Sequence, residues 1–360
     1  MNFFSLFEKP KNSVAFSFDH ETIRYVSLTR AREGISVVNH GSELLGAEII
    51  SPNGLIVNDT LLIDRLRKIK NRIDFGNDKN HAVMVVPDHL ALMFHTHIAK
   101  ESGQQMNDVI INHIKTYCAA NLSLPFSDYI CEYDIILETS WGYDAHVTLV
   151  PKLIVNHFTR IFKQADIVIT HIETAHHAVA RACLEIPTGN GAVLVSVGKK
   201  QSTVAVLHGD HCVSQRVVKV GEETIATTIQ NYLRTDRAYA DKIIARHGML
   251  QTHPDVGLLG ELYLAIDPIC RSIDEQLIAI GQIPYKTFGE RFITENIFVY
   301  GSGTHIQGLI PLIGEKAGLA ARELDIWAGY RHERAPLLDM HAKEILTYAE
   351  PLALALVYLK

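Results

Sequence analysis

Two hairpin-like stretches, one in each half of the sequence, restrict the possible folds more than any other feature. "AFSFDHETIRYVSL" begins at residue 15, and "AVLVSVGKKQSTVAVL" begins at residue 192. Each stretch has the pattern of an apolar strand, a short polar turn and a second apolar strand. Ser17 and Ser196 stand at the same place in the two stretches, and they lie 179 residues apart, about half the length of the chain. We therefore expect a duplicated fold in which each half is built around one hairpin.

Helical and strand-like segments alternate after each hairpin. A further strand-like run follows directly, at Ile35–Val38 in the first half and at Val213–Val220 in the second. Helices are predicted at Asp59–Arg72, Val155–Gln164, Thr174–Cys183, Thr224–Tyr232, Leu258–Ile280 and from Gly308, and strands at Ala82–Val86, Ile167–His171 and Asn296–Tyr300. This alternation predicts open α/β sheets covered by helices on both faces. Residues 82–150 interrupt the first half with strands and one helix, Gln105–Ala120, which indicates an inserted α+β subdomain.

Composition excludes several classes of protein. The 360 residues are 47% hydrophobic, enough for two domains with separate cores. The net charge of −6 and the scattered Lys and Arg residues argue against a nucleic-acid partner. Five widely spaced cysteines without a CxxC pair are typical of reduced thiols in a cytoplasmic protein. Apolar runs stay shorter than the ~18–20 residues of a membrane span. The nineteen histidines lack the spacing of a metal site.

Four further stretches resemble segments of a known protein superfamily. They are "NHGSELLGAEIISPNGLIVNDTLLIDRLRKI" from residue 39, "VVPDHLALMFHTHIAK" from residue 85, "NLSLPFSDYICEYDII" from residue 121 and "EPLALALVYLK" from residue 350. In order and spacing, these stretches and the two hairpins resemble the actin-like ATPase superfamily. Within it, the sequence looks like the PilM family of type IV pilus assembly proteins, and more distantly like FtsA. The resemblance covers essentially the whole chain.

The resemblance implies a bilobed actin-like fold, an α/β architecture of the duplicated, ribonuclease-H-like kind, with an inserted small α+β subdomain. Domain I is expected to comprise residues 1–184 and a returning segment, 336–360, with the insertion at about 82–150. Domain II is expected to span residues 185–335. Ser17 and Ser196 are then expected on facing hairpins.

The nucleotide motifs of the family are altered in this sequence. The aspartate that opens the first phosphate loop is Ser17, the glycine of that loop is Asp19, and the aspartate of the second loop is Ser196. The family's Gly-Gly-Glu phrase is Gly221-Glu222-Glu223, and its adenosine turn is Gly301-Ser302-Gly303. The residues that the resemblance assigns to nucleotide binding are Thr22, Arg24, Gly198, Ser202, Thr203, Gly221, Glu223, Gly301, Ser302 and Gly303.

Serine is a much weaker ligand than aspartate for a hard cation, so we expect no hydrolysis, no catalytic residue and no metal ligand of the protein's own. ATP binding, weak or absent, stays open, with Mg²⁺ bound only together with nucleotide. The Gly301–Gly303 turn suits a nucleoside, and it equally suits an ordinary connection from a strand to a helix.

Three functions compete on this sequence. The first is a cytoplasmic PilM-like scaffold or adaptor of a type IV pilus inner-membrane assembly complex. The second is an active actin-like ATPase or filament-forming protein. The third is a sugar or acid kinase, which the absence of an Asp-x-Gly-x-Thr phrase disfavours.

For the scaffold, the resemblance implies binding to the N-terminal cytoplasmic segment of a PilN-like inner-membrane protein, in a groove beside the insertion. It further implies contacts with other pilus assembly proteins, and self-association is an open possibility. Through these partners the protein would lie at the inner face of the cytoplasmic membrane.

Overall fold

The chain divides into two compact units. The computed structural model describes residues 12–19, 21–31, 34–46, 48–51, 55–75, 80–100, 103–184, 190–209, 211–250, 252, 254–281, 293–330, 340 and 342–359. One unit comprises Met1–Pro87, His157–Glu185 and Leu324–Lys360, and the other comprises Asp88–Asn156 and Ile186–Glu323. The expected domain boundaries at residues 185, 335 and 336 lie outside the described residues.

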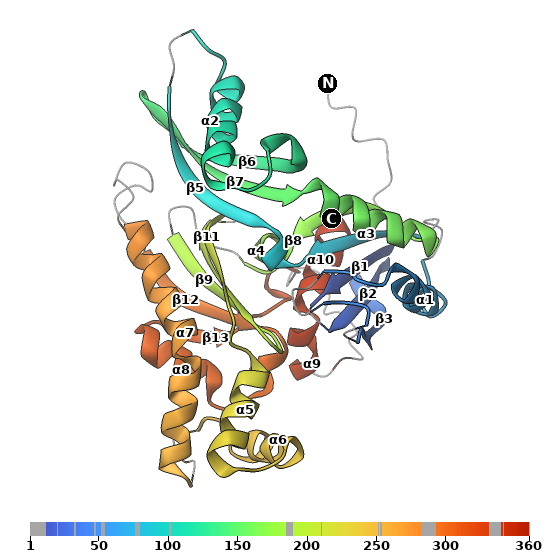
Figure 1. The fold of residues 1–360 in the computed structure, drawn as a ribbon, viewed down its shortest axis with the longest axis vertical. Helices are drawn as coiled ribbons and strands as arrows, with labels where there is room; N and C mark the ends of the chain where they lie inside the picture. The colour runs from blue at the N-terminus through green and yellow to red at the C-terminus, as the bar shows by residue number, and fades with distance from the viewer. Residues whose placement is uncertain are drawn as a thin grey trace. The chain divides into compact units, whose positions relative to one another are not determined.

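A five-stranded sheet forms the centre of the first unit (Figure 1). Its strands are β1 (Asn12–Phe18), β2 (Thr22–Ala31), β3 (Gly34–Leu44), β4 (His81–Val86) and β8 (Val168–Thr174). They lie in the order β3-β2-β1-β4-β8. The first hairpin and β3 are antiparallel, whereas β4 and β8 continue the sheet in parallel. The sequence therefore predicts the first hairpin correctly.

The second unit repeats this sheet. Its strands are β9 (Asn190–Val197), β10 (Ser202–His208), β11 (His211–Val218), β12 (Ile293–Tyr300) and β13 (Ala320–Glu323). They lie in the corresponding order, β11-β10-β9-β12-β13, with the same parallel and antiparallel pairings. A register shift lies between Ser27 and Leu28 in β2, and another lies between Val206 and Leu207 in β10, again 179 residues apart. The shared irregularity confirms the predicted duplication, because bulges are specific features of a strand pair.

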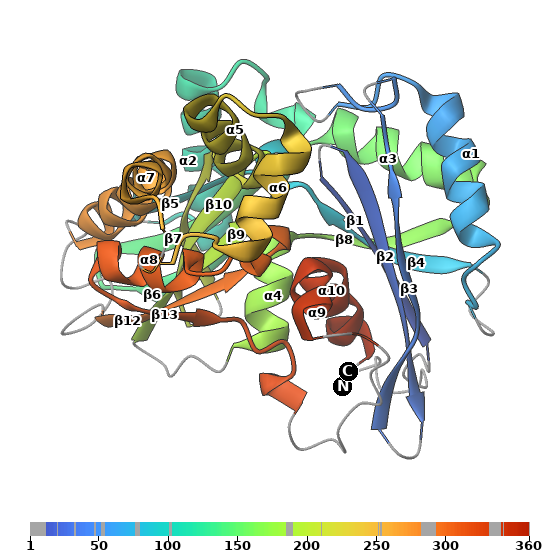
Figure 2. The same cartoon turned by 90° about the horizontal axis from the view of Figure 1, so that it is seen from below.

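Helices cover both faces of the first sheet. On one face, α3 (Lys152–Gln164) packs Phe162 edge-on against Phe16 of β1 and Phe158 at a tilt against Phe18, with ring centroids 5.1 and 5.0 Å apart. Helix α10 (Ala349–Leu359) packs on β1, β2 and α4 (Ala175–Cys183). Figure 2 shows α10 on the opposite face of the sheet from α1 (Asp59–Lys70). A short helix, α9 (Ala342–Thr347), precedes α10. The two-sided covering explains why β1 is apolar on both of its faces.

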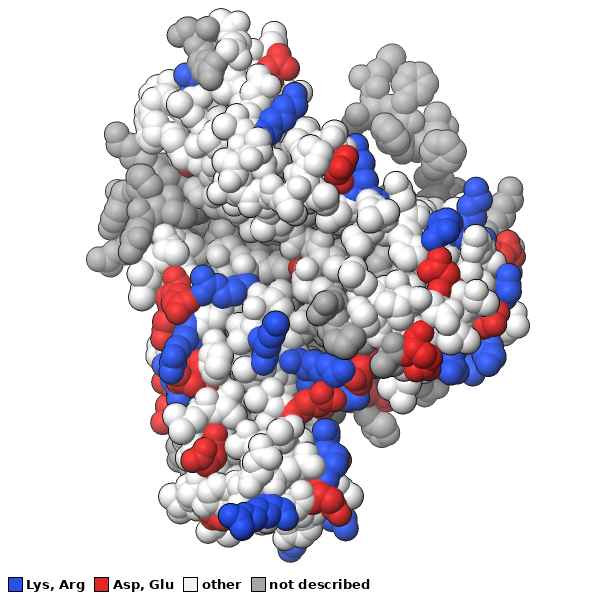
Figure 3. Space-filling model, viewed as in Figure 1, with Lys and Arg blue, Asp and Glu red and all other residues white. Residues whose placement is uncertain are grey.

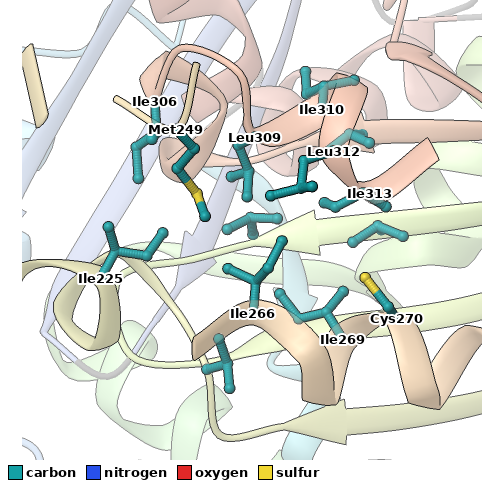
Figure 4. Packing of buried hydrophobic residues seen from close by; sticks show 14 of the residues in the cluster. Ile225, Met249, Ile266, Ile269, Cys270, Ile306, Leu309, Ile310, Leu312 and Ile313 are labelled. Carbon is teal, nitrogen blue, oxygen red and sulfur yellow. The ribbon is translucent and has the colours of Figure 1, made fainter. Parts of the chain in front are cut away.

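In the second unit, helices bury one face of the sheet. The helices are α5 (Glu222–Leu233), α6 (Arg237–Arg246), α7 (Val256–Gly281) and α8 (Leu309–Ala317). Figure 4 shows Ile266 and Ile269 of α7 beside Leu309 and Leu312 of α8, in the cluster that also contains Val195 of β9. Helix α6 and strand β13 are additional elements that the sequence patterns did not indicate.

The insertion is a three-stranded antiparallel sheet with one helix. Strands β5 (Leu92–Ala99), β7 (Gly142–Pro151) and β6 (Tyr129–Glu138) lie in that order, and α2 (Met106–Asn121) packs against one face. Strand β5 packs near β11, and the insertion belongs by its contacts to the second unit.

The expected start of the insertion at residue 82 is wrong. Ala82–Val86 lies in β4, which pairs with β1 and β8 in the first sheet, so these residues are buried as a central strand of that sheet. The other expected helices and strands are present, with ends shifted by a few residues. No helix of the described residues is long and apolar enough to cross a membrane.

Candidate functional site

The hairpin of β9 and β10 carries three of the residues that the resemblance assigned to nucleotide binding, Gly198, Ser202 and Thr203. Ser196 pairs with Thr203 and Val197 pairs with Ser202, so Gly198 is the first residue beyond the paired strands. The Gly198 N–H donates to the carbonyl of Gln201 at 3.0 Å, which closes a tight turn. The buried Ser202 hydroxyl donates to the carbonyl of Val220 at 2.7 Å. Ser202 therefore ties the hairpin to the segment that leads into α5.

Helix α5 begins directly against this turn. Any Cβ at Gly221 would lie 2.5 Å from the Gly198 carbonyl oxygen, so only glycine permits this approach. The N–H groups of Glu222 and Glu223 donate to the carbonyls of Gly198 and Lys199 at 3.1 and 2.9 Å. The first N–H groups of a helix often bind anions. In α5 two of them are satisfied by the hairpin, which disfavours an anion site at this helix end.

The Gly301-Ser302-Gly303 turn closes on the same hairpin. Gly301 has φ +97°, and a Cβ there would lie 2.5 Å from the Val197 carbonyl oxygen. A Cβ at Gly303 would lie 2.3 Å from Cγ1 of Val197. Ser302 begins a 3₁₀ helix, Ser302–His305. The structure thus brings the assigned glycines of the second unit together around one end of β9, and the close packing alone explains why glycine occupies Gly301 and Gly303.

In the first unit, Thr22 and Arg24 follow the turn between β1 and β2, and both bind Asp19. The Thr22 N–H donates to Oδ1 of Asp19 at 2.7 Å, and the Arg24 guanidinium donates to Oδ2 at 2.7 Å. The Glu21 N–H also donates to Oδ1, at 2.8 Å. Arg24 is therefore held in an ion pair within its own hairpin. The sequence indicated the cation and the carboxylate but missed their pairing.

The assigned residues thus form two groups, one in each unit. Thr22 and Arg24 belong to the first, and Gly198, Ser202, Thr203, Gly221, Glu223, Gly301, Ser302 and Gly303 belong to the second. That Ser17 and Ser196 face one another stays a prediction.

The residues at the ends of β1 and β9 do not fit a magnesium ion. Mg²⁺ is usually held through carboxylates, whereas Ser17 and Ser196 offer hydroxyls, and Ser17 is only 1% exposed. The nearby carboxylate of Asp19 already accepts hydrogen bonds at both oxygens. Within the described part of the chain, no three His, Cys, Asp or Glu side chains are grouped to hold a metal ion. A magnesium-dependent step has no ligand set of the protein's own in this region.

A histidine–aspartate cluster on the inserted sheet was not predicted. Asp144 on β7 is buried, and its Oδ1 lies 3.0 Å from Nδ1 of His97 and 3.7 Å from Nε2 of His95, both on β5. Burial lowers the pKa of His95, with the Asp144 charge acting in the opposite direction and His97 adding to the lowering. The alternation of histidines in "HTH" on a strand was the only signal in the sequence, and it did not reveal the partner.

Charges of both signs are mixed over the surface of the described residues in the view of Figure 3. Lys and Arg alternate there with Asp and Glu. The region around α2 and β5–β7 carries few charged side chains on that face.

Comparisons with known proteins agree on the fold. No protein-family profile matches the sequence, and no curated protein sequence matches it. Among solved structures, a chain of a PilM–PilN type IV pilus biogenesis complex is similar, with 14% identity and a TM-score of 0.71, over 97% of this chain and 98% of that chain. EutJ, an ethanolamine utilization protein of Carboxydothermus hydrogenoformans, has 13% identity and a TM-score of 0.56, over 97% and 91% of the two chains. MreB5 of Spiroplasma citri bound to AMPPNP has 11% identity and a TM-score of 0.52, over 89% and 94%.

Each of these similarities extends over at least 89% of this chain. The resemblance seen in the sequence is confirmed at the level of the fold: this chain has the actin-like fold of PilM, with an inserted three-stranded subdomain.

Proposed function

We propose that the protein is a PilM-like scaffold or adaptor of a type IV pilus inner-membrane assembly complex, without ATP hydrolysis. Similarity to a PilM–PilN complex over 97% of the chain supports the type of assembly. The observation that carries the non-hydrolytic part is the chemistry at the end of β1. Ser17 is buried there, and Asp19 is fully engaged by Glu21, Thr22 and Arg24.

Phosphoryl transfer depends on a metal ion that neutralises the charge developing on the transferred group. The serine near the end of β1 and the serine near the end of β9 are poor ligands for such a metal ion. The Arg24 guanidinium, the cation expected near a phosphate, is paired with Asp19. The residues that would position a nucleophile and a metal therefore make other contacts in this chain, and we propose no catalytic residue.

The partner proposed for this scaffold is the N-terminal cytoplasmic segment of a PilN-like inner-membrane protein. The inserted subdomain is the proposed place of contact, because its exposed surface includes Trp141, Ile130 and Leu124, all 38–42% exposed. Figure 3 shows few charges on the face of this subdomain that is turned to the viewer. Leu124 and Ile130 lie near the start of β6 and Trp141 follows its end, so apolar side chains are exposed at both ends of this sheet. Exposed apolar side chains favour protein contacts. Through such a partner the protein would be held at the inner face of the cytoplasmic membrane, with the other pilus assembly proteins recruited around it.

A nucleotide-binding actin-like ATPase or filament-forming protein is the second candidate. One observation favours it: the glycines at 198, 221, 301 and 303 keep side chains away from the end of β9. MreB5, of similar fold, was solved with AMPPNP. Under this proposal ATP binds with Mg²⁺ held by the nucleotide.

Two measurements on the purified full chain separate the candidates. Calorimetry with ATP and Mg²⁺ and an assay of phosphate release should both give no signal above background for the scaffold. Phosphate release by the unmodified protein that is abolished by Arg24→Ala would refute it.

The scaffold proposal has a positive test in cells. Crosslinking followed by mass spectrometry should place a short segment of a single-span membrane protein on the inserted subdomain. The substitution Trp141→Ala should weaken that crosslink, and Tyr239→Ala, which removes a comparably exposed aromatic side chain elsewhere in the second unit, should leave it unchanged. Crosslinks confined to residues outside the insertion would contradict the proposed contact.

A further inference from the structure

Three hydrogen-bond donors converge on one point in the turn between β1 and β2. They are the N–H groups of Glu21 and Thr22 and the guanidinium of Arg24, and all three donate to the Asp19 carboxylate at 2.7–2.8 Å. Adjacent backbone amides together with a guanidinium are the donor set with which proteins bind oxyanions. We propose that this turn is an anion-binding site whose ligand is the chain's own Asp19 carboxylate, so that the site is closed to phosphate-type anions from solution.

The second hairpin shows that the turn does not need this carboxylate in order to form. The Asp19 N–H donates to the Thr22 carbonyl at 3.0 Å, and the Gly198 N–H donates to the Gln201 carbonyl at 3.0 Å. The two turns close with the same backbone bond, one with aspartate and one with glycine at the first position. The backbone hydrogen bond alone is therefore enough to close the turn. The Asp19 side chain has a separate effect, which is to occupy the three donors.

The position of the site allows the Asp19 carboxylate to occupy it and also leaves it accessible to anions from solution. The Asp19 side chain is 30% exposed, whereas the Arg24 side chain is 14% exposed and Thr22 is buried. The donors are thus fixed in place, and the point on which they converge opens to solvent. An anion from solution competes with a carboxylate that is covalently attached beside the donors and therefore present at a very high effective concentration. At ordinary anion concentrations the attached Asp19 carboxylate therefore occupies the three donors.

The probe for this proposal is pyrophosphate, measured by calorimetry on the full chain without metal. The unmodified protein should give no binding signal up to ~5 mM pyrophosphate. Asp19→Gly makes the first turn like the second and opens the site, so it should bind pyrophosphate at least about tenfold more tightly than the unmodified protein. Asp19→Gly combined with Arg24→Ala should return the signal to background, because the charged donor is lost.

Asp19→Asn is the matched control that separates occupation from charge. Its side-chain oxygen still accepts from the N–H groups of Glu21 and Thr22, whereas its NH2 group cannot accept from Arg24. Two of the three donors therefore stay occupied while the negative charge is removed, and binding of pyrophosphate should stay at background. Binding by Asp19→Asn as strong as that of Asp19→Gly would overturn the proposal, since repulsion alone would then have kept anions away.

The variant Asp19→Gly must be folded for this comparison to hold. Far-UV circular dichroism and thermal unfolding show whether Asp19→Gly is folded, and Asp19→Ala, which exposes the same donors with less backbone freedom, serves in its place if it is not. Folded Asp19→Gly and Asp19→Ala proteins that both fail to bind pyrophosphate overturn the proposal. The proposal is also overturned if the unmodified protein binds pyrophosphate and Asp19→Gly binds it with the same affinity. The measurement involves no partner, so its failure leaves the proposed contact with a PilN-like segment untouched. The inference shares with the proposed absence of hydrolysis the observation that Asp19 is bound within its turn, and the assay of phosphate release tests that absence separately.

Discussion

The two five-stranded sheets share strand order, pairing and even the position of a bulge, but they differ at the turns of their hairpins. In the second unit the turn after β9 is a packing centre, where Gly221 and Gly301 bring two other segments against the backbone of Val197 and Gly198. In the first unit the turn after β1 carries a side-chain network around Asp19. The two units thus share a backbone plan, while the residues at the strand ends decide which contacts each turn makes.

The cores of the two sheets differ in the size of equivalent residues, and this sets the largest expected effect. Phe16 and Val195 are 179 positions apart, both 0% exposed, and both lie opposite the equivalent residue of the next strand, Tyr25 and Val204. Phe16→Ala should lower the free energy of unfolding by about 3–5 kcal/mol. Val195→Ala should cost about 2 kcal/mol, because fewer buried methyl groups are lost.

Chemical denaturation of the two variants, followed by far-UV circular dichroism, tests this order. Hydrogen exchange then assigns each loss to one sheet. If the two variants lose equal free energy of unfolding, or if Val195→Ala loses more, then Phe16 and Val195 do not occupy equivalent places in their cores, as the register indicates that they do.

The close packing at the second turn gives the next largest effect. Gly301 combines φ +97° with a backbone oxygen 2.5 Å from any added Cβ. Gly301→Ala should lower the free energy of unfolding by about 2–4 kcal/mol, since both backbone strain and a collision with the backbone are introduced. Gly318 has φ +63° and open space around it, so Gly318→Ala should cost only about 1 kcal/mol, the cost of a left-handed backbone for alanine. Thermal unfolding of the pair checks this, and similar losses for both would contradict a packing role for the turn.

These glycines illustrate how far the sequence alone reaches. The hairpins, their separation of 179 residues and the helical spacing of α1, α3 and α7 are local patterns, so the sequence predicts them and the duplicated fold. The glycine positions were found through motif resemblance, but their packing on Val197 depends on segments about a hundred residues apart. The pairing of Asp19 with Arg24 and of Asp144 with His97 likewise depends on strand register, which a sequence pattern does not fix.

Histidines distinguish the two units under acid conditions. In the second unit, burial lowers the pKa of His95 and of His208, and the neighbouring His211 lowers that of His208 further. The folded state then resists a proton that the unfolded state accepts, so stability is full above pH ~6.5 and declines as the pH falls from there to the lowered pKa. The slope is at most about 1.4 kcal/mol per pH unit for each histidine.

Hydrogen exchange at pH 5.5 and 7.5, corrected for intrinsic rates, measures this within one molecule. Acidification should deprotect β5, β7 and β10 more than β1 and β2. His95→Gln should reduce the difference, whereas His305→Gln, at an exposed position, should leave it in place. Deprotection of β1 and β2 to the same extent would show that the effect is global and not centred on the histidines of the second unit.

The smallest expected difference concerns the charged pairs at the two turns. Arg24 and Asp19 lie 2.7 Å apart with side chains 14% and 30% exposed, whereas Lys199 and Glu223 lie 3.7 Å apart and are 38% and 33% exposed. Arg24→Ala should lower the free energy of unfolding by about 1 kcal/mol, because a charge-assisted hydrogen bond in a partly buried place is lost. Lys199→Ala should change it by less than about 0.5 kcal/mol, since solvent screens an exposed pair. Urea unfolding at 0.05 and 0.5 M salt resolves the two, with added salt reducing the effect of Lys199→Ala further while most of the Arg24→Ala loss remains. A loss for Lys199→Ala as large as that for Arg24→Ala would mean that the second turn also depends on a charge network, and the contrast between a packed turn and a charged turn would not hold.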